Sequence, residues 1–250
     1  ADGSQIAAHT VVFNGDPLAL PALLGAAPGR PKLHPARSLS ARVWTFAAQV
    51  APTGLGRDAL GYHSVFFADD EAAEFQPLSR NQTPSAPTIY VCAQDRLDGT
   101  PDGPERFQMI LNAPAVAAQD ERTERCQNHP LARLRHFGLQ MGPWPQAAQL
   151  TTPAQFAQLF PASQGALYGQ SPNSTWATFQ RPQARTGLAG LYLAGGGVHP
   201  GAGVPMALLS GQHAAQAVQS DQISPARSRL MAMRGGMSTV SATAARGRFL

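Results

Sequence analysis

The sequence is poor in charge and in cysteine, and it has no long apolar run. Charged residues make up 14% of its 250 residues, whereas about 25% is usual in soluble proteins. The two cysteines, Cys92 and Cys126, lie far apart without C-x-x-C spacing, which argues against a disulfide framework or a zinc site and favours reduced thiols. No apolar stretch approaches the roughly 18 to 20 residues of a spanning helix, and no secretory signal pattern is present. We therefore expect neither a membrane-spanning segment nor export.

Motifs that mark hydrolases and metalloenzymes are also missing. The seven histidines show no metal-binding spacing such as H-x-x-x-H, and no G-x-S-x-G turn presents a serine nucleophile. An acidic cluster, Asp69-Asp70-Glu71 with Glu74, is most simply explained as the solvated start of a helix. We therefore expect no metal site.

The net charge of +4 comes from the last thirty residues. Residues 1–220 hold 14 basic and 14 acidic side chains, whereas residues 221–250 hold five arginines and one aspartate. These arginines have a single aromatic neighbour, Phe249, and so lack the stacking platform typical of nucleic-acid binding. We interpret residues 221–250 as a basic flexible tail, with weak attraction to anionic lipid as the alternative, and expect no nucleic-acid partner.

The chain is rich in turn residues, yet 43% hydrophobic content is enough to build a core. The β-branched run Ala8–Phe13 predicts a buried strand, after which Asp16 can cap a helix that begins at Pro17. A buried strand needs partners on both sides. This one is therefore either a sheet edge, or its other partners lie in sequence outside this chain.

The middle of the chain alternates between strand patterns and turn clusters, with no long helix among them. This spacing predicts an antiparallel or mixed sheet whose strands fall at residues 42–50, 62–67, 88–93 and 107–111. Residues 114–137 are charged and helical in pattern, with Pro130 expected to break or kink the run. A short helix is predicted at residues 154–160, after Thr152-Pro153.

The most informative segment runs from a short strand, Gly190–Ala194, through a loop to a helix predicted at Val204–Val218. Five glycines in the nine loop residues allow backbone amides to approach a ligand, and Pro205 fits the first helical turn. The unpaired N–H groups of the helix start suit a phosphate or a polarised ring. A tight turn packed on its own sheet explains the glycines equally well, because the third glycine of a dinucleotide fingerprint is absent.

Two further features of this kind leave their interpretation open. His199, inside the glycine loop, either contacts a cofactor or bonds to carbonyls of its own turn. Residues 54–59 (GLGRDA) match the letters G-x-G-x-x-A, but a strand pattern follows at once and leaves no helix to bind phosphate. The small residues that are predicted to form one packing face of the last helix are Ala207, Gly211, Ala214, Ala215 and Val218.

Taken together, these segments resemble a known family. LYLAGGGVHPGAGVPMALLSG (191–211) is similar to the carboxyl-terminal signature of bacterial carotenoid desaturases of the phytoene desaturase type, which contain FAD. The resemblance covers residues 1–218 and is closest to the hydroxyneurosporene (methoxyneurosporene) desaturase branch. It continues backwards through TTPAQFAQLFPASQGALYG (151–169), ERFQMILNAPA (105–115), PTIYVCAQDR (87–96), HSVFFADDEAAEF (63–75) and VVFNGDP (11–17).

The resemblance implies an α/β fold in which a doubly wound FAD-binding domain holds an inserted mixed-sheet substrate domain. The first FAD-binding segment would be residues 1–30, the substrate domain 31–185 and the return segment 186–220, with the tail after it. Family members are about twice as long and open with a G-x-G-x-x-G turn, so the amino-terminal FAD-binding half would be missing here. The residues that this resemblance places against FAD are Gly195, Gly196, Gly197, Val198, His199, Gly203, Val204, Pro205 and Met206.

The activity implied is introduction of a carbon–carbon double bond into a carotenoid, with FAD as cofactor and no catalytic acid or base assigned. The protein would be cytoplasmic and peripherally associated with the lipid surface of the inner, photosynthetic membrane. Two alternatives stay open. The chain could be a truncated non-catalytic fragment or a lipid-surface binding module, or it could belong to a related flavin oxidoreductase of the retinoid saturase or amine oxidase kind.

Overall fold

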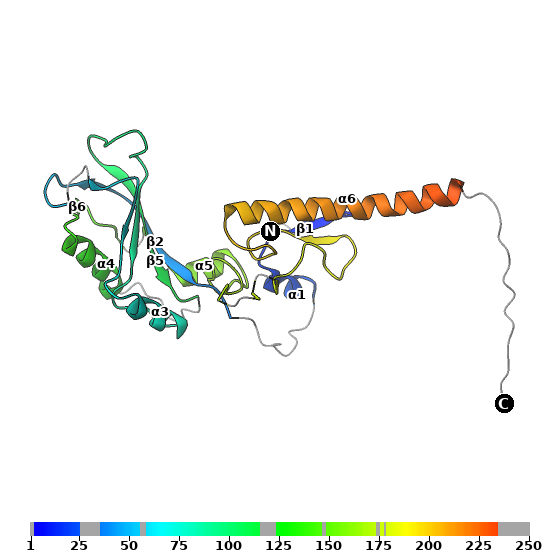
Figure 1. Cartoon of the computed structure of the whole chain (residues 1–250), viewed down its shortest axis with the longest axis horizontal. Coiled ribbons are helices and arrows are strands. Elements are labelled where there is room, and N and C mark those ends of the chain that lie inside the picture. Colours follow the sequence, from blue (N-terminus) through cyan, green and yellow to red (C-terminus); the bar gives the residue numbers. More distant parts are fainter. Residues whose placement is uncertain are drawn as a thin grey trace, which may run out of the picture.

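Two sheets and one long helix organise the protein (Figure 1). The computed structural model describes residues 3–25, 36–55, 59–115, 124–146, 149–173, 176–177 and 179–234. The larger sheet lies at one end of the molecule with helices α3 and α4 beside it, and the long helix α6 runs along the other end, with α5 between them.

The larger sheet has six strands in the order β3-β4-β5-β2-β6, with β7 also pairing to β2. Every strand pair in it is antiparallel, which confirms the antiparallel alternative of the strand pattern, whereas the mixed sheet implied by the resemblance is wrong for the described strands. Strands β4 and β5 are antiparallel because the short connection at 94–104 reverses the direction of the chain between them. The strands are β2 (Ser40–Val50), β3 (His63–Phe66), β4 (Ile89–Ala93), β5 (Glu105–Ala113), β6 (Met141–Gly142) and β7 (Leu150–Thr151).

The core lies on one face of this sheet. Alternate residues of β2 and β5, such as Trp44 and Phe107, are fully buried there, as the period-2 pattern predicts. Helix α4 (Glu124–His136) adds Leu131 and Leu134 to the same cluster. Pro130 lies inside α4 and does not end it.

All four strands predicted in this part of the chain are confirmed, with shifts of a few residues at their ends.

Helix α3 (Glu71–Ser79) explains the acidic cluster and corrects part of its interpretation. Asp70 caps the helix by accepting the N–H of Ala72 at 2.9 Å, so the predicted helix start is confirmed. Glu74, however, is buried rather than solvated, and it accepts a hydrogen bond of 2.6 Å from the Thr88 hydroxyl. The helical period is the cause, because Glu74 lies one turn before Leu78 on the face that packs inward.

The short helix α5 (Pro153–Leu159) confirms its prediction. Thr152 and Gln155 form a reciprocal capping box that fixes its start. The two apolar residues at its carboxyl end, Leu159 and Phe160, are both exposed.

The smaller sheet is a parallel pair, β1 (Val11–Phe13) and β8 (Leu191–Leu193), with Val11 opposite Leu191. The predicted strand is present at a sheet edge, but its predicted burial is wrong, because Val11 and Val12 are each 49% exposed. Successive residues of a strand point to opposite faces. The exposure of both valines therefore shows that neither face of β1 is fully covered within the described chain.

Helix α6 (Val204–Arg234) continues well beyond the predicted end at Val218. Residues 221–234, which were expected to belong to a flexible tail, are helical, and residues 235–250 lie outside the described part. The helix contacts β8, and its buried residues in this stretch are Ser210, Ala214 and Ala217. Ala215, predicted on the packing face, is exposed.

Asp16 and Pro17 behave as the sequence indicates. Asp16 accepts the N–H of Leu18 at 3.0 Å and caps a 3-10 turn, η1 (Pro17–Ala19), which leads into α1 (Leu20–Leu23).

In the part of the chain that the structure describes, no helix combines the length and apolar content that crossing a membrane requires.

Candidate functional site

The glycine loop after β8 lies against the loop after β1. Because the two strands are parallel, their carboxyl ends meet at one edge, which is where open α/β sheets bind ligands. The contact is close: a Cβ at Gly195 would lie 2.9 Å from the side-chain oxygen of Asn14, and one at Gly197 would lie 2.9 Å from Cδ of Pro17. The two glycines thus allow the loops to approach each other.

Ser210 ties the loop to α6. Its buried hydroxyl accepts the N–H of Gly195 at 2.7 Å and donates to the carbonyl of Ala207, also at 2.7 Å. Ser210 therefore sets the distance between the end of β8 and the first turn of α6.

Arg181 supports the loop from behind. It is 5% exposed, and its guanidinium donates to the carbonyls of Gly196 (3.0 Å), Tyr168 (3.1 Å) and Gln170 (2.9 Å). Burial, and after it the nearby charge of Arg37, lowers the pKa of Arg181 below its usual value. An arginine remains charged even so, which leaves a buried positive charge beside the glycine loop.

Arg37 joins the loop after β1 to the segment that precedes the large sheet. It forms an ion pair with Asp16, both side chains being at least nine-tenths buried. Its guanidinium also donates to the carbonyl of Ser163 at 3.1 Å. The ion pair and the cap on η1 share the same carboxylate, so the entry to η1 is fixed from two sides.

The amide side of the glycine loop faces away from these supports. The carbonyls of Gly195 and Gly196 are taken up by Val198 N–H and by Arg181. In a trans peptide the next N–H points the opposite way from the carbonyl. Consistently, the amides of Gly196, Gly197 and Val204 donate no hydrogen bond to any described residue. Three donors are thus left for a ligand.

The predicted site residues differ in burial, and Gly195, Gly196, Gly197 and His199 are half-buried. Val198 is 1% exposed and packs inside, whereas Val204 and Met206, with Gly203 and Pro205, form the exposed start of α6. Gly203 has φ +99°, and a Cβ there would meet no atom within 4 Å, so its glycine serves the backbone turn. The structure therefore brings all nine predicted residues into one continuous loop and helix start.

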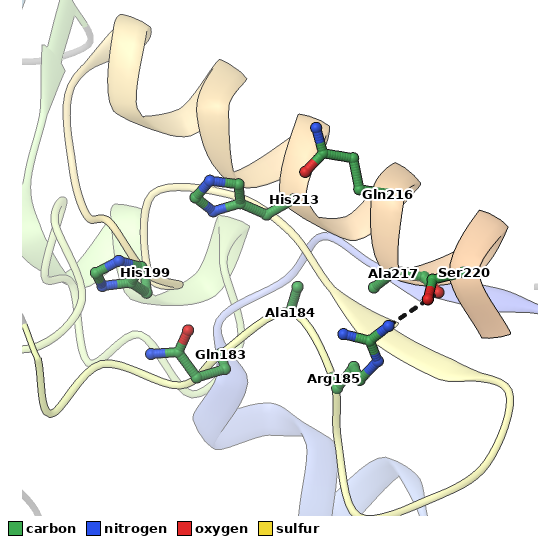
Figure 2. A pocket seen from close by; sticks show the side chains of 8 residues that line it. All are labelled: Gln183, Ala184, Arg185, His199, His213, Gln216, Ala217 and Ser220. Atoms are coloured by element: carbon green, nitrogen blue, oxygen red, sulfur yellow. Dashed lines mark hydrogen bonds between the residues drawn. The ribbon is translucent and has the colours of Figure 1, made fainter.

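His199 lies on a groove at the side of α6. Its N–H donates to the carbonyl of Pro182 at 2.8 Å, and its ring lies nearly parallel to that of His213, with centroids 6.2 Å apart. Figure 2 shows both rings facing the same space as Gln183, across from Arg185. The groove has a volume of about 640 Å³ and is lined by Gln183, Ala184, Arg185, His199, His213, Gln216, Ala217 and Ser220.

Arg185, which lines this groove, belongs to a hydrogen-bond network with Asp221 and Tyr192. Asp221 accepts hydrogen bonds from Arg185 at 2.9 Å and from the Tyr192 hydroxyl at 2.9 Å. The bond from Arg185 and then that from Tyr192 lower the pKa of the Asp221 carboxyl, while the bond to Asp221 raises the pKa of Tyr192. These shifts follow from pairing at the surface and indicate no reactive group.

Sequence reasoning missed the residues that hold the loop in place, namely Arg37, Arg181 and Ser210. Arginine and serine occur throughout the chain, and their partners here are mostly backbone groups that leave no sequence pattern. The near-match at 54–59 gains no support: a Cβ at Gly54 would meet the carbonyl of Gly138, and residues 56–58 lie outside the described part. Among the described residues no cluster of side chains could hold a metal ion.

These features fit a flavin. A loop whose free amides face outward, next to a helix start and a buried positive charge, suits an electron-rich ring that gains negative charge. A close approach of the loop backbone is possible because most of its side chains are hydrogen atoms.

Comparison with known proteins agrees with this chemistry. The sequence pattern of the family described as "Flavin containing amine oxidoreductase" matches residues 2–219. The chain belongs to this family. The match includes β1, the six-stranded sheet, the glycine loop and the first half of α6.

The proteins to which the chain is similar include enzymes of carotenoid metabolism. The chain is 50% identical over 234 residues to the hydroxyneurosporene desaturase of Cereibacter sphaeroides, a match that covers 91% of this chain and 46% of that protein. It is 45% identical to the hydroxyneurosporene desaturase of Rubrivivax gelatinosus, covering 97% and 47%. It is 27% identical to the 1-hydroxycarotenoid 3,4-desaturase of a Flavobacterium, covering 60% and 32%. The chain thus spans about half the length of the curated relatives it matches.

Proposed function

We propose that this chain forms the flavin-facing loop and the substrate domain of an FAD-dependent desaturase that introduces a carbon–carbon double bond into a carotenoid. The single observation that carries the proposal is the glycine loop at the carboxyl edge of β1 and β8, with free amides in front and Arg181 behind. The similarity to two hydroxyneurosporene desaturases supports a hydroxylated or methoxylated substrate.

In this proposal the chain divides as its topology suggests. Residues 1–30 and 186–220 would belong to the FAD-binding domain, and residues 31–185 to the substrate domain. The hydrogen bond from Ser38 N–H to the Gly169 carbonyl (2.9 Å) and the bridge between Arg37 and Gln170 draw the two ends of the inserted segment together. This is the arrangement expected where one domain is inserted into another.

Each group of the loop would have a defined task. When bound, FAD supplies the acceptor for a hydride equivalent, while the second hydrogen leaves the substrate carbon as a proton. The amides of Gly196, Gly197 and Val204 would stabilise negative charge on the ring, and Val198 and Ser210 would hold the loop still. The low charge of the chain suits a dry slot for an apolar polyene.

A hybrid enzyme provides the test. This chain would be joined to the part of the Cereibacter sphaeroides desaturase that it does not match, and the purified protein incubated with a hydroxylated polyene. Each added conjugated double bond moves polyene absorption to longer wavelength, so the product is detected by its spectrum. If the hybrid copurifies with flavin but causes no spectral change in carotenoid substrates, the protein is a flavoprotein and the proposed desaturase activity is refuted.

Association with a lipid surface is the second part of the proposal. Large apolar side chains are exposed near the glycine loop, where Val204 is 76% and Leu208 71% exposed. A polyene is dissolved in lipid, so an exposed apolar rim beside its binding slot would let substrate pass directly between membrane and protein. The alternative of a non-catalytic lipid-binding module uses the same rim, and the hybrid enzyme separates the two by its activity.

A further inference from the structure

Arg181 differs from the other arginines near the loop in having only carbonyl partners. Arg37 pairs with Asp16, and Arg185 pairs with Asp221. Arg181 donates to three backbone carbonyls, and no described carboxylate forms an ion pair with it. Carbonyls satisfy the donors of a guanidinium without cancelling its charge.

The surroundings hold this charge in one place. A Cβ at Gly201 would lie 3.2 Å from Nε of Arg181, and a Cβ at Gly169 would lie 3.7 Å from its Nη1. The guanidinium therefore has close neighbours from the loop and from the segment before it. A buried charge without a counter-ion is costly, so its retention beside a loop with free amides calls for an explanation.

The orientation of the Gly196–Gly197 peptide explains why this buried charge is retained. Its carbonyl points to Arg181 at 3.0 Å, so its N–H points away from Arg181 and has no described partner. The same arginine thus orients a donor toward the open side of the loop and places positive charge behind it. Both effects favour an electron-rich group on the open side.

We propose that Arg181 is a positioning residue that turns the Gly196–Gly197 amide toward the flavin and stabilises the reduced, anionic flavin over the oxidised one. This inference rests on the proposed function, since it takes the flavin to lie on the open side of the glycine loop. It adds to the proposed function one residue, Arg181, and one role, a preference of the site for reduced over oxidised flavin.

The test measures the affinity of the hybrid enzyme for oxidised and for reduced flavin, from a spectrophotometric redox titration against free flavin. The unmodified enzyme is expected to bind reduced flavin more tightly than oxidised flavin. Tighter binding of oxidised flavin by the unmodified enzyme would overturn the proposal without any variant.

Three variants separate charge from shape. Arg181→Gln keeps N–H donors but loses the charge, and is expected to reduce the preference for reduced flavin by about tenfold. Arg181→Lys keeps the charge but loses the planar, forked set of guanidinium donors. It is expected to keep the preference for reduced flavin within about threefold of the unmodified enzyme and to weaken the affinity for both redox states. Arg185→Gln, which removes an exposed and paired arginine, serves as control and should change neither affinity.

Each outcome decides something. An unmodified hybrid that binds no flavin refutes the proposed function itself, and the inference falls with it. Flavin binding with equal redox preference in the Gln and Lys variants shows that Arg181 acts by packing alone and overturns only the inference. If Arg181→Gln does not fold, the preference of the unmodified enzyme and of Arg181→Lys decides.

Discussion

The N–H of Gly195 and the hydroxyl of Ser210 are 2.7 Å apart and join the end of β8 to α6. Ser210→Ala removes this acceptor and leaves a shielded N–H without a partner, which costs roughly 1–3 kcal/mol of unfolding free energy. We expect a lower midpoint in urea for the hybrid enzyme and a weaker hold on flavin. Ser220→Ala, at an exposed position of the same helix, is the control and should leave both unchanged.

Gly197 should tolerate no side chain. A Cβ there would lie 2.9 Å from Cδ of Pro17, so Gly197→Val must separate the glycine loop from the loop after β1 and is expected to abolish flavin retention. Gly187→Val is the matched control, since Gly187 lies outside the glycine loop and a Cβ there would meet no atom within 4 Å. Absorbance in the flavin bands after gel filtration measures both. Full flavin content in a well-folded Gly197→Val protein would contradict this account.

The Arg185–Asp221 pair should make a small, pH-dependent contribution to stability. The pKa of Asp221 is lowered in the folded protein, so the contribution is present above the ordinary aspartate value of about 4 and is lost as the pH falls below it. Thermal unfolding of the unmodified protein and of Asp221→Asn should therefore differ at pH 7, and the difference should shrink as the pH falls through the lowered pKa of Asp221 in the folded protein. A difference that stays constant over this range would show that the carboxylate charge is not involved.

The basic segment is expected to strengthen binding to anionic membranes. Five arginines fall within residues 221–250, and each basic residue near an anionic surface contributes about 1 kcal/mol. Flotation with anionic liposomes at low salt should decrease when residues 235–250 are removed and decrease further when Arg227, Arg229 and Arg234 become glutamine. High salt should reduce the difference. Equal flotation of all forms at low salt would exclude a role for this segment.

The 250-residue chain by itself should bind FAD weakly or not at all and should be poorly soluble. The outer edge of β1 has no strand partner among the described residues, and Val11 and Val12 are half exposed, which favours edge-to-edge association. Titration of the isolated chain with FAD, followed by flavin fluorescence, is the measurement. Saturable micromolar binding by a soluble monomer would be the contrary result.

Local patterns explain which parts of the fold could be predicted. Trp44 and Phe107 belong to strands whose alternation is complete within a few residues, and Thr152 with Gln155 forms a cap that depends on neighbours three residues apart. Each of these elements is therefore visible in a short stretch of sequence. The glycine loop was located for the same reason.

The remaining features depend on contacts between distant segments. Nothing in the residues next to Arg181 shows that its guanidinium will be buried against carbonyls from three other positions. The burial of Glu74 was not predicted because the nearby residues 69–71 are acidic and exposed, while its partner Thr88 lies fourteen residues later, just before β4. The predicted end of α6 at Val218 was too early because the polar composition after Val218 resembles a tail, whereas the helix continues to Arg234.

The pairing of β1 with β8 is expected to form late in folding. Val11 pairs with Leu191, 180 residues later, so this contact closes a very long loop. If the six-stranded sheet forms first, the bridge between Arg37 and Gln170 shortens that loop roughly fourfold and lowers the entropy cost of closing it by about 1.2 kcal/mol. The parallel pair, and with it the glycine loop, is then assembled last. Damage to the distant sheet would therefore delay the step that makes cofactor capture possible, without touching a single residue that faces the cofactor.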